Sequence, residues 1–410
     1  MKKLILAIFT IISIGSCSHQ VLMSDSADNT ALPKNIILII GDGMGPAYTS
    51  AYRYYHDNPN TAEVEETVFD RYLVGSSSTY PAPVSGYVTD SAAGATALSL
   101  GVKSYNGAIG VDVNKNKVRS VLEFAKFQGK RTGVVVTSQV NHATPASFLS
   151  HNESRQNYNE ISDSYFDEKI NGQFKMDLIL GGGWKYFLRD DRNLVNEFKQ
   201  SGFQYLDKYQ QLNDIKPNKP VLGLFADIGL PWALDDTNPH RLLAMTKAAT
   251  KQLENDKGFF MLIEASQIDW AGHNNDITAA MGEMDDLAKT LEYLETYVAK
   301  YPNTLVIVTA DHSTGGLTVA ANGIYQWHPD YLRMLKHSPN VIASILTDEE
   351  ITAESTKTLF NIDLTEQELT ELISIKHYPK HSMTEKDDLG NPYQDSKASK
   401  IKSALYKKVK

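Results

Sequence analysis

Four short apolar runs, rich in Ile and Val, constrain the fold of this chain more than any other feature. They cover Asn35–Ile40, Thr132–Thr137, Phe259–Glu264 and Thr304–Thr309. Runs of this length are typical of strands in a parallel sheet that is covered on both faces. Stretches of helical character, Val118–Gln128 and Met281–Ala299, lie between them. The pattern predicts an α/β fold, with a doubly wound, mostly parallel sheet and helices on both faces.

Composition narrows the range of partners. The chain has 410 residues, of which 42% are apolar and 22% charged, so a soluble protein with a large core is expected. Its formal net charge is −9. Proteins that bind nucleic acid usually carry a basic surface, so the sequence predicts no nucleic acid as a partner. An acidic protein can still bind phosphate where metal ions and arginines supply positive charge.

The N-terminus predicts export. Lys2 and Lys3 precede an apolar run, Leu4–Ile14, that is too short to span a bilayer and is typical of a signal peptide. The run leads into Ile-Gly-Ser-Cys17, which resembles a lipobox. We expect residues 1–17 to be a lipoprotein-type signal peptide with lipidation at Cys17, 18–32 a tether, and 33–410 the folded domain. The protein would then be periplasmic or lipid-anchored to the outer membrane. An ordinary signal peptide with an incidental cysteine is the alternative.

The cysteine count limits the metal chemistry. Cys17 is the only cysteine of the chain, so the mature domain has no internal disulfide and no thiolate metal site. Any zinc must be held by His, Asp and Glu side chains.

Polar residues with possible chemical roles follow several of the apolar runs. Asp42 lies in a glycine-rich turn after the first run, where it could bind a metal or cap a helix. Ser91 lies at the start of a helix of small residues, where an anion is favoured, although a helix cap is the simpler interpretation. No histidine is near Ser91 in sequence, so a metal ion is the expected activator of its hydroxyl.

Later segments add further candidate ligands. Asp269 and His273 stand four residues apart, on one face if the segment is helical, and could form half of a zinc site or an ordinary surface pair. Asp311 and His312 follow the fourth run directly. Arg155 could grip phosphate or be a solvated surface residue. Several such sets, each just past a strand, favour a metal site over separate structural roles.

The motifs together resemble those of bacterial alkaline phosphatases. GDGMG, VTDSAAGAT, HATPASF with a downstream SR, E-x4-D-x3-H and TADHSTGG occur in the order and approximate spacing of that family, from about Asn35 to Gly316. The resemblance implies phosphate monoesters as substrates, two Zn²⁺ and one Mg²⁺ per chain, and a homodimer. It also implies roles for individual residues.

By that resemblance, Ser91 is the nucleophile that becomes phosphoserine, and Arg155 clamps the phosphate. Asp42 bridges the magnesium and one zinc, and Asp311 and His312 are the remaining protein ligands of that zinc. Asp269 and His273 bind the other zinc. Thr144 and Glu264 bind magnesium, while His142 and Trp270 tune the magnesium site and the bound phosphate.

One expected ligand is missing. The family completes the site at Asp269 and His273 with a histidine near the C-terminus, and none of the later histidines stands before a strand-like run; they are His328, His337, His377 and His381. We therefore expect a fragment or truncated product that binds this zinc weakly and has weak or no activity.

Two other functions compete with a phosphomonoesterase. A phosphodiesterase of the same superfamily is possible, although such enzymes commonly use threonine where this chain has Ser91, and the nucleophile motif of sulfatases is absent. A non-catalytic, lipid-anchored protein that binds phosphate or metal is the second alternative, favoured by the missing histidine.

Overall fold

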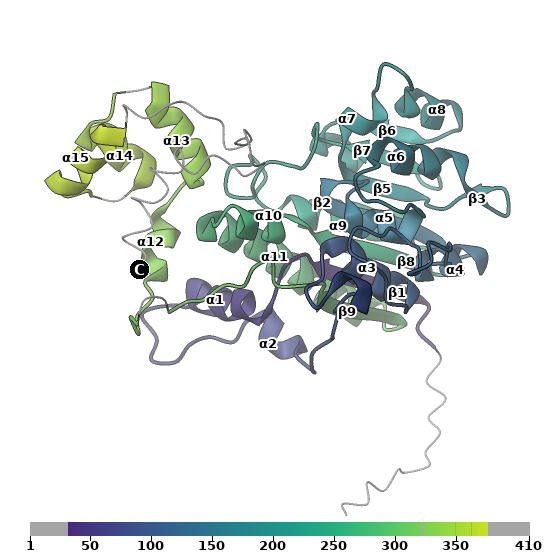
Figure 1. Ribbon diagram of the computed structural model, residues 1–410, viewed down its shortest axis with the longest axis horizontal. Helices are drawn as coiled ribbons and strands as arrows, with labels where there is room; N and C mark the ends of the chain where they lie inside the picture. Colours follow the sequence, from purple (N-terminus) through teal and green to yellow (C-terminus); the bar gives the residue numbers. More distant parts are fainter. Residues whose placement is uncertain (1–31, 321–322, 349, 362, 376–410) are drawn as a thin grey trace, which may run out of the picture. The chain divides into compact units, whose positions relative to one another are not determined.

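The computed structural model describes residues 32–375, apart from 321–322, 349 and 362 (Figure 1). The predicted signal peptide, lipobox and tether lie outside the described residues, except for Leu32. His377 and His381 also lie outside them.

A seven-stranded parallel sheet organises the chain. Its strand order is β6-β7-β5-β2-β8-β1-β9, and every neighbouring pair is parallel. The strands are β1 (Asn35–Gly41), β2 (Arg131–Gln139), β5 (Leu178–Gly182), β6 (Gln204–Leu206), β7 (Val221–Leu224), β8 (Phe259–Ala265) and β9 (Thr304–Ala310). The predicted α/β fold is confirmed, and the four apolar runs are the adjacent strands β2, β8, β1 and β9.

Helices cover both faces of the sheet (Figure 1). On one face, side chains such as Ile37 and Ile39 of β1 pack with α9 and α11 in a single apolar cluster. On the other face, Leu38 and Ile40 pack with a second set of helices. The first set includes α1 (Pro46–His56), α2 (Val68–Tyr72), α9 (Arg241–Leu253), α10 (Gln267–His273) and α11 (Ile277–Lys300). The second includes α3 (Ser91–Leu100), α4 (Val121–Phe127), α5 (Ala143–Leu149), α6 (Tyr158–Asp167), α7 (Trp184–Phe187) and α8 (Leu194–Gln200).

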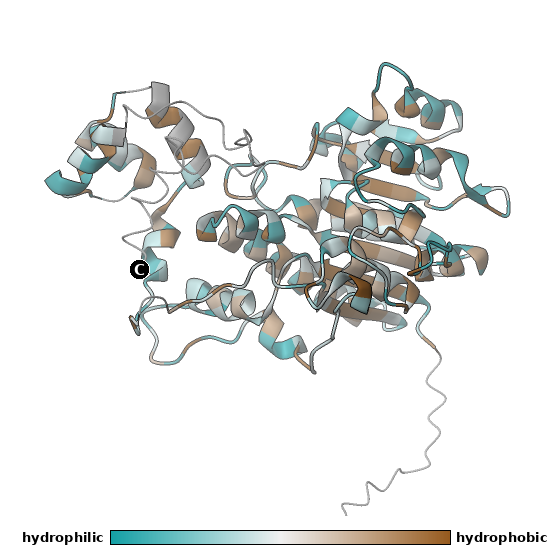
Figure 2. Ribbon diagram, in the orientation of Figure 1, coloured by the Kyte–Doolittle hydropathy of each residue, from teal (hydrophilic) through white to brown (hydrophobic). Residues whose placement is uncertain are grey.

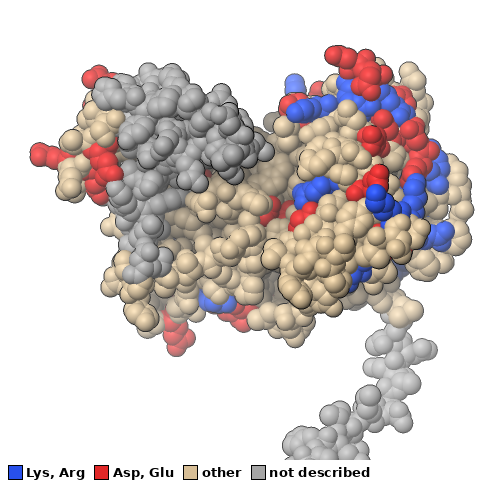
Figure 3. Space-filling view, viewed as in Figure 1, with Lys and Arg blue, Asp and Glu red and all other residues tan. Residues whose placement is uncertain are grey.

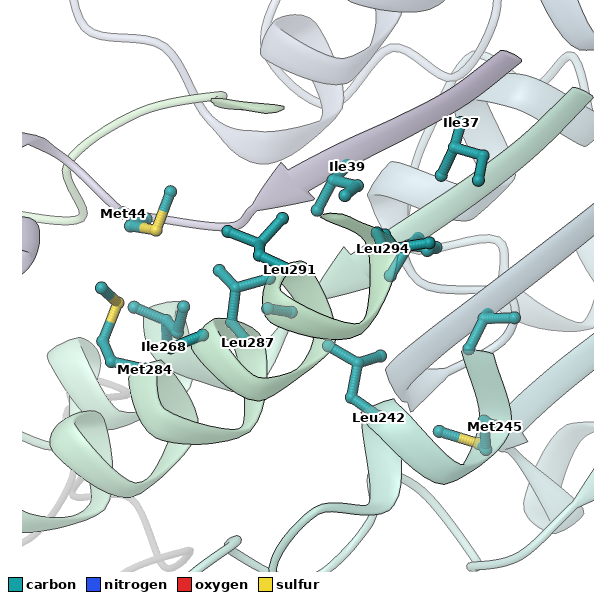
Figure 4. Packing of buried hydrophobic residues seen from close by; sticks show 14 of the residues in the cluster. Ile37, Ile39, Met44, Leu242, Met245, Ile268, Met284, Leu287, Leu291 and Leu294 are labelled. Atoms are coloured by element: carbon teal, nitrogen blue, oxygen red, sulfur yellow. The ribbon is translucent and has the colours of Figure 1, made fainter. Parts of the chain in front are cut away.

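The core explains why the strand residues are apolar throughout. Figure 4 shows Leu287, Leu291 and Leu294 of α11 facing Ile37 and Ile39 of β1. Because both faces are buried, consecutive strand residues are all apolar rather than alternating with polar ones. The strands accordingly form the apolar centre of Figure 2.

Helix boundaries follow from local capping. The predicted helix Val118–Gln128 begins instead at Val121, because Ser120 and Glu123 form a capping box there. The side chain of Asp276 accepts a hydrogen bond from the amide of Ala279 at 2.9 Å, so α11 begins at Ile277, four residues before the predicted Met281.

Short elements complete the described chain. They are the 3₁₀ helices η1 (Pro83–Ser85) and η2 (Tyr209–Asp214) and the antiparallel pair β3 (Lys169–Ile170) and β4 (Gln173–Phe174). Acidic and basic side chains are interspersed on the molecular face in Figure 3. Within the described chain, no helix combines the length and the apolar character that a membrane crossing requires.

The segment after β9 forms helices with a small core of their own. They are α12 (Pro329–Met334), α13 (Pro339–Asp348), α14 (Ala353–Phe360) and α15 (Glu366–Ile375). Helix α13 ends at Asp348, and α14 begins after Thr352, whose side chain caps it. Phe360 of α14, Leu372 of α15 and Ile351, between α13 and α14, are buried in this small core.

Strand β9 lies at one end of the sheet order. Among the described residues it pairs only with β1. Leu305 and Ile307, which alternate with more buried neighbours, are 41% and 43% exposed. This strand is therefore less covered than the other three that the sequence predicted.

Candidate active site

Side chains from distant segments meet at the carboxyl ends of the central strands, as the fold class predicts. Asp42 directly follows β1, and Glu264 is the penultimate residue of β8. Asp311 and His312 directly follow β9. Since β8, β1 and β9 are neighbours, residues more than 200 positions apart in sequence lie side by side.

Ser91 lies at the centre of this group. It is the first residue of α3 and is buried. Its Oγ is 3.0 Å from Nε2 of His312 and 3.4 Å from Oδ1 of Asp42. The residue before it, Asp90, is the N-cap and accepts a hydrogen bond from the amide of Ala93 at 2.9 Å. Ser91 is therefore not the cap itself, and its hydroxyl is directed to candidate metal ligands.

The contact with His312 is one that the sequence analysis missed. A search for a histidine near Ser91 in sequence finds none, yet β9 brings His312 beside it across 221 positions. The same His312 nitrogen is 3.2 Å from Oδ1 of Asp42 and 3.6 Å from Oδ2 of Asp311. A hydroxyl, an imidazole and two carboxylates thus share one small volume.

The carboxylates repel one another in this volume. Burial, and then the charges of Asp311, Asp269 and Glu264, raise the pKa of Asp42 well above its usual range. Burial likewise raises the pKa of Asp311, and it raises that of Glu264 to about 7. An arrangement that is unfavourable for anions without a counter-charge is favourable for a divalent cation.

The donor atoms fit a set of bound cations. Asp42, His142 and Glu264 offer ligand atoms within 4.8 Å of one another, as do Asp42, Asp269 and His312. Within the described structure, three buried carboxylate oxygens of the candidate ligands have no hydrogen-bond partner, namely Oδ2 of Asp42, Oε1 of Glu264 and Oδ2 of Asp311. Oxygen and imidazole ligands suit zinc and magnesium. Asp42 belongs to both groups, as a bridging ligand would.

Asp269 and His273 lie on one helical turn of α10, as their spacing predicts. Oδ2 of Asp269 is 3.4 Å from Nε2 of His273, whose side chain is 70% exposed. No group of three candidate ligands among the described residues includes His273. Of the later histidines that the structure describes, His328 is exposed and His337 lies 3.5 Å from Asp235.

Arg155 is not the solvated residue that its sequence context alone favoured. Its side chain is 18% exposed, and Nη1 donates to Oδ2 of Asp90 at 3.0 Å. Its Nη2 lies 3.0 Å from Nε2 of His142. Burial, followed by the charge of Arg155, lowers the pKa of His142 well below its usual value, so this imidazole is neutral. Trp270 packs edge-on against His142, with ring centroids 5.6 Å apart.

Hydrogen bonds to the candidate ligands come from residues that the sequence analysis did not single out. Ser266 donates to Oε2 of Glu264 at 2.6 Å, and the amide of Gly43 donates to Oδ1 of Asp311 at 3.0 Å. Thr144, an expected magnesium ligand, is fully buried beside His142 on α5. One glycine of the sequence motifs indicates close packing at the site. A Cβ at Gly94 of α3 would lie 3.1 Å from the carbonyl oxygen of Asp311, so α3 packs directly against this residue.

Comparison with known proteins decides the family. The sequence profile named "Alkaline phosphatase" matches residues 33–391. The chain belongs to the alkaline phosphatase family. As a member of this family it is a hydrolase of phosphate monoesters.

Similar proteins include alkaline phosphatase 3 of Bacillus subtilis (strain 168), which is 48% identical over 352 residues that cover 85% of this chain and 76% of the relative. Among solved structures, the cold-active alkaline phosphatase from the psychrophile Shewanella sp. is 46% identical, with a TM-score of 0.81 over 92% of this chain and 87% of that one. A mutant of the alkaline phosphatase from the Antarctic bacterium TAB5, with Mg bound in its M3 site, is 34% identical, with a TM-score of 0.63 over 71% of this chain and 81% of that one.

Proposed function

We propose that this alkaline phosphatase family member transfers the phosphoryl group of a monoester to Ser91 and then to water, at a site that holds two Zn²⁺ and one Mg²⁺. The observation that carries the proposal is the position of Ser91. Its hydroxyl is buried at the start of a helix, within 3.4 Å of both His312 and Asp42.

The candidate ligands divide into three sets. Asp42, Asp311 and His312 would hold one zinc, Asp269 and His273 the other, and Asp42, Thr144 and Glu264 the magnesium. Magnesium is supported by the TAB5 mutant, whose third site holds Mg. His142 is close enough to Asp42 and Glu264 to act as a further ligand of that ion. When bound, the ions would supply positive charge and lower the pKa of coordinated hydroxyl groups.

The protein's own groups would orient the phosphoryl group. Arg155, held by Asp90, presents a planar guanidinium that can donate to two phosphate oxygens. The amides of Ser91 and Ala92 belong to the first turn of α3, and backbone N–H groups at a helix N-terminus favour an anion. Ser91 Oγ gives up its proton and forms the new bond to phosphorus as the bond to the leaving group breaks, and the leaving alkoxide takes up a proton to become the alcohol. Water then attacks the phosphorus of the phosphoserine, one of its protons returns to Ser91 Oγ, and inorganic phosphate is released.

Trapping the intermediate tests the proposal. Protein supplied with zinc, magnesium and p-nitrophenyl phosphate would be quenched in acid and digested, and the Ser91 peptide is expected to carry a phosphoryl group. Ser91→Ala should lose both label and turnover, while Ser99→Ala, in the same helix but bonded to Ser147, should keep them. An unlabelled peptide in an active wild type would contradict the mechanism. An unlabelled and inactive wild type would instead favour the binding protein, and preferential cleavage of bis-p-nitrophenyl phosphate a phosphodiesterase.

We further propose that one zinc binds weakly. Among the described residues, Asp269 and His273 are the two candidate ligands of this ion, whereas catalytic zinc usually has three from the protein. Turnover should therefore rise with added zinc well above the stoichiometric amount, and full activity at two zinc ions per chain would contradict this proposal.

The location and assembly of the protein are also proposals. The signal sequence and lipobox support export and anchoring through Cys17, and family analogy supports a homodimer. Fatty-acid labelling that persists in Cys17→Ser would contradict the anchor. A monomeric mass in solution would contradict the dimer.

A further inference from the structure

Thr314 occupies a backbone conformation that is unusual for its residue type. It lies in a turn in which the amide of Gly316 donates to the carbonyl of Ser313 at 2.7 Å. Its φ angle is 50°, in the left-handed region that β-branched residues rarely adopt. Two glycines follow it directly in the sequence, yet this position keeps a threonine. A strained backbone conformation next to an active site indicates that the side chain has a functional role.

The side chain of Thr314 contacts a candidate metal ligand. Its hydroxyl donates to Oδ1 of Asp269 at 2.7 Å. The other oxygen of that carboxylate, Oδ2, is the one that faces His273. The backbone amide of Thr314 also donates to Nδ1 of His312 at 3.0 Å, so that Nε2 of this ring faces Ser91. One turn therefore contacts a candidate ligand of each proposed zinc.

Neighbouring glycines leave room for this hydroxyl. A Cβ at Gly43 would lie 2.2 Å from Oγ1 of Thr314 and 2.9 Å from Oδ1 of Asp269. A Cβ at Gly272 would lie 3.1 Å from the same hydroxyl. Three segments, after β1, in α10 and after β9, thus close around the Thr314–Asp269 contact.

We propose that Thr314 is a positioning residue for the zinc held by Asp269 and His273. Its hydroxyl fixes the rotation of the Asp269 carboxylate, so that Oδ2 is presented beside His273 before the ion arrives. A ligand that is held by a hydrogen bond loses less freedom on binding, and removal of such partners typically costs metal affinity. Since the described part of the chain offers two candidate ligands for this ion, the orientation of each has a large effect. The inference rests on the proposed function.

Three variants separate this role from folding. Thr314→Val keeps the branched shape and the backbone strain but lacks the hydroxyl. Thr314→Ser keeps the hydroxyl. Thr314→Gly lacks the hydroxyl and relieves the backbone strain. Relief of strain raises the Tm of the metal-free protein, while the added flexibility of the unfolded chain lowers it, so we expect a Tm close to that of the wild type.

Zinc affinity is the deciding measurement, by competition with a chromogenic chelator. For the weaker of the two zinc ions we expect a loss of about 10- to 100-fold in Thr314→Val and Thr314→Gly, and near wild-type affinity in Thr314→Ser. The tighter zinc should change little, because the substitutions leave its proposed ligands Asp42, Asp311 and His312 in place. Excess zinc should restore kcat in Thr314→Val.

The possible failures are distinguishable. If the wild type binds two zinc ions and Thr314→Val binds both equally well, the positioning role is wrong while the proposed function stands. If the wild type binds no zinc, the proposed function fails, and the positioning role fails with it.

Discussion

A single carboxylate next to the nucleophile has three partners. Asp90 accepts hydrogen bonds from the amides of Ala93 and Gly107, and it forms the ion pair with Arg155. The first contact caps α3 and the third fixes the guanidinium. The residue before Ser91 thus links helix stability to the geometry of the phosphate clamp.

Replacing Asp90 should separate these two effects. Asp90→Ala is expected to lower the free energy of unfolding by about 1 kcal/mol through loss of the cap, whereas Asp90→Ser keeps a capping oxygen and should lose less. Both variants free Arg155 from its ion pair, so inorganic phosphate should inhibit both more weakly than the wild type. Chemical denaturation and phosphate inhibition measure the two effects. Unchanged phosphate inhibition in both variants would show that Asp90 does not position Arg155.

Individual candidate ligands were predictable from sequence, while the residues that orient them were not. Asp42, Asp311 and His312 each stand just after an apolar run, so strand prediction alone brought them to one edge of the sheet. Thr314 is 45 positions from Asp269, and its hydroxyl is one of many in the chain. Only the path of the backbone shows which hydroxyl reaches which carboxylate. The contact between His312 and Ser91 likewise depends on the path of the backbone and cannot be read from their distance in sequence.

At the scale of elements, a buried ionic network joins α4 to the segment that follows α6. Nζ of Lys175 lies 2.8 Å from Glu123 and 2.6 Å from Glu168. His151 lies 3.4 Å from Glu123. Burial alone would lower the pKa of His151, but the nearby carboxylates of Glu123 and Glu168 favour the charged ring, outweigh burial and raise the pKa to about 9.

This network should make stability depend on pH. The folded pKa of His151 exceeds its ordinary value of 6.5, so the stabilisation is complete below pH 6.5 and is lost as the pH rises through 9. At pH 6 we expect the free energy of unfolding of the wild type to exceed that of His151→Gln by on the order of 2 kcal/mol. This difference should shrink by pH 10. Urea denaturation at several pH values measures it, with His328→Gln, at an exposed site, as the control. A difference that is independent of pH would contradict the role of His151.

Strand prediction succeeded for the long apolar strands and failed for the short ones. The four predicted strands are seven to nine residues long, while β5, β6 and β7 have five, three and four residues. Gly181, Gly182 and Gly223 interrupt the apolar signal in two of these. Their pairing depends on neighbours already in the sheet, which local sequence does not specify.

At the scale of the whole molecule, bound metal ions should stabilise the fold. Without them, burial raises the pKa of Glu264 to about 7, so the folded state favours the protonated acid. That stabilisation is complete below the ordinary pKa of 4.5 and is lost as the pH rises through 7. The Tm of protein dialysed against EDTA should therefore fall between pH 5 and pH 8, and zinc with magnesium should restore it.

The matched control for this prediction is Glu264→Gln. It removes one buried charge, so its metal-free Tm should depend less on pH than that of the wild type. If EDTA leaves the Tm of the wild type unchanged at pH 8, the cluster does not bind structural cations.

The sparse covering of β9 has a consequence for handling the protein in solution. In the part of the chain that the structure describes, no strand pairs with the side of β9 that faces away from β1. Such a strand, with protruding aliphatic side chains, is a template on which another chain can add. Concentrated stocks should scatter light increasingly on standing. A lysine in place of Ile307 should suppress this without touching the catalytic end of the sheet, because charge on such a strand disfavours stacking of copies.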